Sequence, residues 1–168
     1  MSLLFLLSAS ALLLTAAWND IATRLIPDAI SLWLLAIGAL ARLFEGHPTD
    51  LAFSVVTALL LLSLLLTLHS RGLIGGGDVK IMTALAVGLS PLDCYRFIVA
   101  TAIAGGLLGI TYLGLSRRLP PMRRVKGISL LNRVANLELR RIRRRGPLPY
   151  GVAIAAGGTF VLLHTGGL

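Results

Sequence analysis

Two aspartates, Asp20 and Asp78, stand where long apolar segments of the chain meet polar ones. Asp20 closely follows the apolar run 3–18, and Asp78 follows three glycines and precedes another apolar run. An ionisable residue beside a membrane span is a candidate functional residue. Two carboxylates held close together share a proton, and such a pair can activate a water molecule and protonate a leaving amine. These residue types therefore fit aspartyl protease chemistry, provided that the fold brings them together.

The composition indicates an integral membrane protein rather than a soluble domain. Of the 168 residues, 56% are hydrophobic and only 14% are charged. This length corresponds to one domain, which we place at 1–168. The single cysteine, Cys94, excludes an intramolecular disulfide and a cysteine-based zinc site.

Six apolar runs predict an all-α fold with about six transmembrane helices, at 3–18, 29–44, 51–68, 79–89, 97–115 and 150–163. The fourth run is short, since a full crossing needs about 20 residues. The spacing of Gly105 and Gly109 in the fifth run favours close helix packing in lipid. The run Gly75-Gly76-Gly77 predicts a turn before the fourth span, with Asp78 as a cap of that helix.

The net charge of +9 is concentrated in one loop. Residues 116–149 hold eleven Lys and Arg and one acidic residue, Glu138. Such a loop sets membrane orientation and is not a nucleic-acid footprint. The positive-inside rule places loops 19–28, 70–78 and 116–149 in the cytoplasm, and loops 45–50 and 90–95 on the other side. Asp20 and Asp78 are therefore expected on the same cytoplasmic face.

The positions of the two aspartates within their helices suggest different roles. Asp20 lies near a helix C-terminus, where the helix dipole disfavours negative charge, and Asp78 lies at a helix start, where it is favoured. This predicts Asp20 as the proton holder and Asp78 as the base, although Arg24, four residues after Asp20, acts in the opposite direction.

The long basic loop contains a periodic segment. From Ile128 onward, apolar residues recur at spacings of three and four among arginines. This pattern predicts a basic amphipathic helix in the cytoplasmic interface that binds membrane lipids. The alternative is a charged loop that only sets orientation.

Three sequence elements together resemble the type IV prepilin leader peptidases, and within them the short form associated with Flp/Tad-type pili. They are Asp20 followed by Ile26-Pro27-Asp28, the stretch from Gly75 to Lys80, and the stretch from Pro149 to Gly157. The resemblance implies a GxGD-type intramembrane aspartyl endopeptidase of the bacterial inner membrane, with Asp20 and Asp78 as its catalytic pair. It implies prepilin or pseudopilin substrates, cut at the cytoplasmic face between a short basic leader and the apolar helix, and no metal or cofactor.

Larger members of that family also methylate the new amino terminus and carry an insert with paired Cys-x-x-Cys motifs. This chain has neither the insert nor the paired cysteine motifs, so N-methyltransferase activity is not expected. Two other classes remain open from the sequence: another GxGD-type intramembrane protease, and a non-enzymatic membrane scaffold or transporter.

Five further residues are candidates for substrate binding. The backbone of Gly75, Gly76 and Gly77 could pair with an extended substrate strand, since no side chains intervene. Lys80 could tune the charge of Asp78 or hold a substrate group, or else anchor its helix at the lipid headgroups. Tyr150 could wall the site or serve as an ordinary interface anchor.

Overall fold

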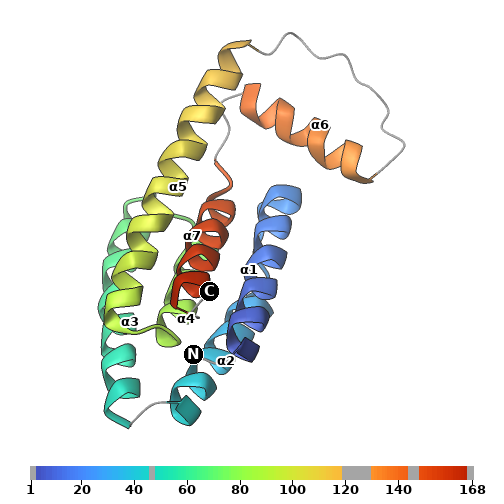
Figure 1. Ribbon diagram of the computed structural model, residues 1–168. Coiled ribbons are helices and arrows are strands. Elements are labelled where there is room, and N and C mark those ends of the chain that lie inside the picture. Colours follow the sequence, from blue (N-terminus) through green and yellow to red (C-terminus); the bar gives the residue numbers. More distant parts are fainter. Residues whose placement is uncertain (1–2, 46–47, 119–129, 144–147, 166–168) are drawn as a thin grey trace.

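The computed structural model describes residues 3–45, 48–118, 130–143 and 148–165, and its regular structure there is entirely helical (Figure 1). The elements in chain order within these ranges are α1 (Leu3–Thr23), α2 (Asp28–Glu45), α3 (Pro48–Ser70), α4 (Gly76–Val87), α5 (Pro91–Arg118), α6 (Leu130–Arg143) and α7 (Tyr150–Thr165). The predicted all-α class is confirmed.

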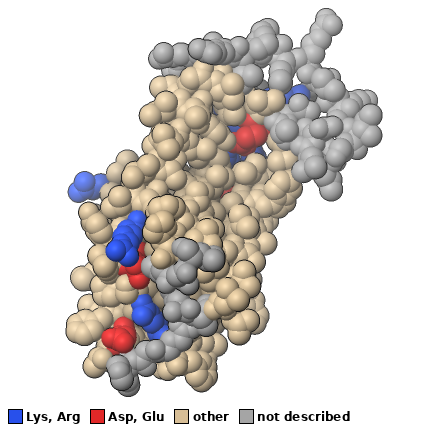
Figure 2. Space-filling model, in the orientation of Figure 1, with Lys and Arg blue, Asp and Glu red and all other residues tan. Residues whose placement is uncertain are grey.

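Three of these helices, α1, α3 and α5, are long and apolar enough to cross a membrane. Uncharged side chains cover most of the face of the molecule drawn in Figure 2, and many leucines point outward from the helices. These features indicate a membrane protein. The other predicted spans correspond to α2, α4 and α7, which have 18, 12 and 16 residues. The count of six crossings therefore stays a prediction.

Helices α4 and α7 lie at the centre of the bundle. Helix α7 packs between α1 and α5, and α4 packs against α2, α3 and α7 (Figure 1). Most side chains of α4 are buried, including Ile81 and Leu85. With 12 residues, α4 rises only about 18 Å, well short of the hydrocarbon thickness of a bilayer, which is about 30 Å. Asp78 lies in the first turn of this buried helix.

Close packing of α5 and α7 depends on Gly157. A Cβ built at this position would lie 2.5 Å from Thr101 Oγ1 and 2.6 Å from the Thr101 backbone nitrogen. The spacing of Gly105 and Gly109 predicted close packing. A Cβ built at either position would instead lie 3.7 Å from its nearest neighbour, an ordinary contact distance. The tight approach therefore involves a glycine of α7 rather than the glycine pair of α5.

One end of the bundle gathers the segments that the sequence assigned to the cytoplasm. Helices α1, α3 and α5 end there, α2, α4 and α7 begin there, and α6 lies across it (Figure 1). Helix α6 confirms the predicted helix in the basic loop, although its expected first residues, 128–129, lie outside the described residues. It contacts α5 and α1, so part of its surface packs on the protein.

Replacing Gly157 with alanine is expected to destabilise the bundle, because the methyl group would meet the Thr101 backbone. Overpacking of this kind costs about 1–3 kcal/mol. The measurement is the thermal unfolding midpoint of the purified protein in detergent. Gly114→Ala on α5 is the control, since nothing lies within 4 Å of a Cβ at Gly114. Equal midpoints for the two variants would contradict the assignment.

Candidate active site

The last turns of α1 position Asp20 against the start of α7. The Asp20 side chain is buried, and its Oδ2 accepts a hydrogen bond of 2.8 Å from the backbone N–H of Gly151. A Cβ at Gly151 would lie 2.9 Å from both Cβ and Oδ2 of Asp20. Only a glycine at this position lets the α7 backbone reach the carboxylate without displacing it. Gly151 lies in the stretch from Pro149 to Gly157 that contributes to the family resemblance, but nothing in the sequence indicated its contact with Asp20.

The first turn of α4 positions Asp78. Gly75 is the N-cap residue of α4, and its backbone N–H donates a hydrogen bond to the Asp78 carboxylate. Asp78 was predicted as the cap of this helix, but the helix begins two residues earlier, so Gly75 is the N-cap residue and Asp78 is the third residue of the first turn. Its side chain is buried within the bundle.

Asp20 and Asp78 lie near enough for their charges to interact. Burial, followed by the negative charge of Asp20, raises the pKa of Asp78 to about 6, while the Gly75 hydrogen bond and the positive charge of Arg24 oppose this rise. A carboxyl with this pKa keeps its proton to a higher pH than a free aspartate does. Burial and the charge of Asp20 thus act on Asp78 against the helix dipole, which alone favoured Asp20 as the proton holder. The assignment of acid and base within the pair stays a prediction.

The three glycines before Asp78 are packed rather than free. Gly75 is exposed, but Gly76 and Gly77 belong to the first turn of α4. A Cβ at Gly77 would lie 3.3 Å from the Ile26 Cβ, and a Cβ at Gly76 would lie 3.5 Å from the His69 ring. The expected flexible turn is thus a helix start, and Gly77 lets the link between α1 and α2 approach it closely. This packing helps bring Asp20 near Asp78.

A cavity of about 460 Å³ opens beside Asp78, between α3, α4, α5 and α7. Asp78, Tyr150 and Thr101 contribute polar groups to its wall, and the remaining lining residues are apolar or glycine. Tyr150 therefore lies where the sequence analysis expected it, beside the candidate site. The apolar lining residues carried no signal in the sequence, because each resembles the other apolar residues of its helix.

Lys80 lies away from this cavity. Its Nζ pairs with Asp28 Oδ1 at 2.8 Å, and both side chains are exposed. The two residues line a separate cavity of about 310 Å³ beside α2 and α4.

Within the described residues, no cluster of three or more His, Cys, Asp or Glu is arranged to hold a metal ion.

Replacing Gly151 with alanine is expected to push Asp20 out of position and to lower the rate of peptide cleavage by about a hundredfold, the cost of a misplacement near 1 Å. The measurement is the single-turnover cleavage rate. Gly109→Ala is the control, since a Cβ there meets only Leu148 Cδ1 at 3.7 Å. A Gly151→Ala variant as active as this control would show that the contact is unimportant.

Comparison with known proteins gives one match. The model of the type IV leader peptidase family matches residues 7–110, a segment that includes both Asp20 and Asp78. No curated protein and no solved structure matches the chain.

Proposed function

The chain belongs to the type IV leader peptidase family, and on this premise we propose that it is an intramembrane aspartyl endopeptidase acting on prepilins or pseudopilins. It would remove their short basic leader at the cytoplasmic membrane face. The observation that carries this proposal is the proximity of Asp20 and Asp78, two buried carboxylates from different helices whose charges interact.

The proposed mechanism uses one proton shared by the two aspartates. Asp78 holds this proton and donates a hydrogen bond to the scissile carbonyl oxygen, while ionised Asp20 takes a proton from the attacking water. The hydrogen bond from Gly151 N–H keeps the Asp20 carboxylate oriented. Collapse of the tetrahedral intermediate breaks the C–N bond, and the departing amine receives a proton from the pair.

We assign the cavity beside Asp78 to the apolar segment that follows the cleaved bond. Its wall is mostly apolar and reaches the carboxyl of Asp78, as cleavage at the border of an apolar helix requires. Tyr150, at the start of α7, would contact the substrate near the cut. Gly75, whose backbone stays exposed, is the glycine of its run best placed to meet an extended leader.

The proposed location is the bacterial inner membrane, with the site facing the cytoplasm. Support comes from the basic loop 116–149, whose helix α6 lies at the same end of the bundle as the end of α1 and the start of α4, the turns that hold Asp20 and Asp78. We further propose an Flp/Tad-type peptidase without methyltransferase activity, because residues 1–168 contain no paired Cys-x-x-Cys motif. Basic side chains of the loop would bind anionic lipids.

Asp20→Asn and Asp78→Asn are each expected to lower leader cleavage by between about a hundredfold and ten-thousandfold, the contribution of a general acid or base. The measurement is leader loss from a co-expressed prepilin, followed by gel mobility and mass of the new amino terminus. Asp28→Asn is the matched control, because Asp28 pairs with Lys80 at an exposed position. Full cleavage by either of the first two variants would overturn the catalytic assignment, and no cleavage of any prepilin by the unmodified protein would favour a scaffold.

Gly106→Leu is expected to fill the cavity and raise the KM for a prepilin about tenfold or more, as loss of an apolar subsite does. Nothing lies within 4 Å of a Cβ at Gly106, so the larger side chain fits without a clash in the free protein. Gly114→Leu on the same helix is the control, because its surroundings are equally open and it does not line this cavity. Equal KM values for the two variants would place the substrate elsewhere.

A further inference from the structure

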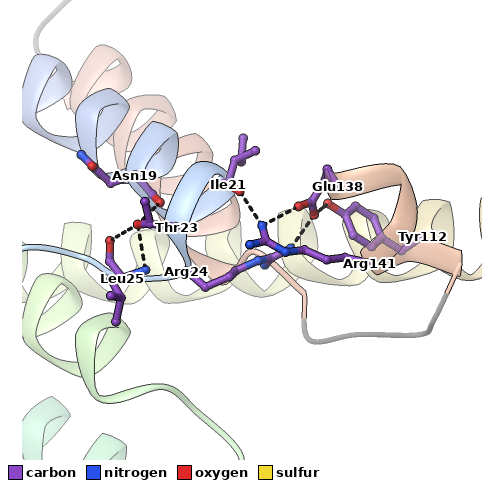
Figure 3. Close-up of polar contacts among 8 residues, drawn as sticks. All are labelled: Asn19, Ile21, Thr23, Arg24, Leu25, Tyr112, Glu138 and Arg141. Atoms are coloured by element: carbon purple, nitrogen blue, oxygen red, sulfur yellow. Dashed lines mark hydrogen bonds and ion pairs between the residues drawn. The ribbon is translucent and has the colours of Figure 1, made fainter. Parts of the chain in front are cut away.

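Helix α6 inserts one acidic side chain into a cluster of donors. Glu138, the single acidic residue of the basic loop, is buried and accepts hydrogen bonds from Arg24 Nη2, the Tyr112 hydroxyl and Arg141 Nη1 (Figure 3). The side chains come from α6, from α5 and from the residue after α1. An acidic residue that would be expected on a solvated surface thus forms a buried junction.

This junction is attached to the turn that carries Asp20. Arg24 has a φ of 60°, and its backbone N–H donates to the Asp20 carbonyl oxygen at 3.0 Å. Arg141 Nη1 also donates to the Ile21 carbonyl oxygen at 2.7 Å (Figure 3). A non-glycine residue in the left-handed region is uncommon and needs support from its surroundings. The ion pair with Glu138 supplies that support.

The Arg24 guanidinium has a second carboxylate target nearby. Its charge acts on both Asp20 and Asp78. Its Nε and Nη1 are buried and have no hydrogen-bond partner among the described residues. A guanidinium with unused donors binds a carboxylate strongly, often through two parallel hydrogen bonds. Without Glu138, Arg24 would therefore turn toward the aspartate pair.

We propose that Glu138 is a positioning residue that holds Arg24 away from Asp20 and Asp78, so that the pair keeps the proton it needs for hydrolysis. This inference rests on the proposed function. Helix α6 then has a role beyond membrane orientation, since it sets the charge around the reacting groups. Among the described residues, the other charged and titratable groups near the pair and the junction include Arg141, Tyr112, Tyr150 and His69.

The test measures cleavage rate against pH for the full-length protein in detergent or liposomes. Glu138→Gln frees Arg24 and removes the negative charge of Glu138 that acts on Asp20. Both changes favour the ionised form of the pair, and the Arg24 part is the one that the double variant below reverses. The pair then loses its shared proton at a lower pH, so the alkaline limb of the profile is expected to move acidward by about one pH unit. The rate at neutral pH falls accordingly, by roughly tenfold for such a shift.

The double variant Arg24→Gln/Glu138→Gln separates this role from simple attachment of α6. If Glu138 acts through Arg24, the double variant regains the wild-type alkaline limb and cleaves faster than Glu138→Gln. Tyr112→Phe is the charge-neutral control, expected to leave the alkaline limb in place because it removes one donor and no charge.

Three results would overturn the inference. One is an unshifted alkaline limb in Glu138→Gln, and another is a double variant no faster than that single one. The third concerns Glu138→Asp, which replaces Glu138→Gln if that variant does not fold. If the alkaline limb of Glu138→Asp fails to move back when Arg24→Gln is added, the inference is overturned as well. Absence of cleavage by the wild-type protein would instead overturn the proposed function and this inference with it, so the two failures are distinguishable.

Discussion

Two buried carboxylates whose charges interact, set in an apolar bundle, impose the main constraint on this structure. Like charges in a poorly solvated place repel each other strongly, and isolated buried charges are costly. The chain supplies a backbone N–H to each one, from Gly151 for Asp20 and from Gly75 for Asp78. The arrangement also requires the ends of two helices to meet. The short central helix α4 meets this requirement, because it begins near the end of α1.

Glycines at three positions allow neighbouring segments of the bundle to pack closely against one another. Gly151 lets the α7 backbone contact Asp20, and Gly77 lets the link before α2 approach the start of α4. Gly157 draws α7 against α5. In each case the space that a Cβ would need is occupied by a neighbouring segment. These glycines therefore contribute through close packing and not through flexibility, the role that the glycine run alone suggested.

Much of the fold follows from hydropathy and charge. Apolar runs predicted six of the seven helices described, and the periodic basic segment predicted α6. Counting crossings placed Asp20 and Asp78 on one face, and the structure brings them together. The cavity beside Asp78 was not predictable, because its wall combines leucines of α3 with small residues of α5, and none differs in type from its neighbours along the helix.

The sequence by itself determined the membrane class, the helical segments and the placement of two aspartates at one end of the bundle, because these depend on patterns read along the chain. Only the tertiary structure decided which partner each charged side chain contacts. Lys80 pairs with Asp28 instead of serving Asp78, and Glu138 reaches Arg24, 114 residues earlier, instead of the solvent. It also buried Asp78 at the start of α4, against helices distant in the chain, an environment that the helix dipole alone did not indicate.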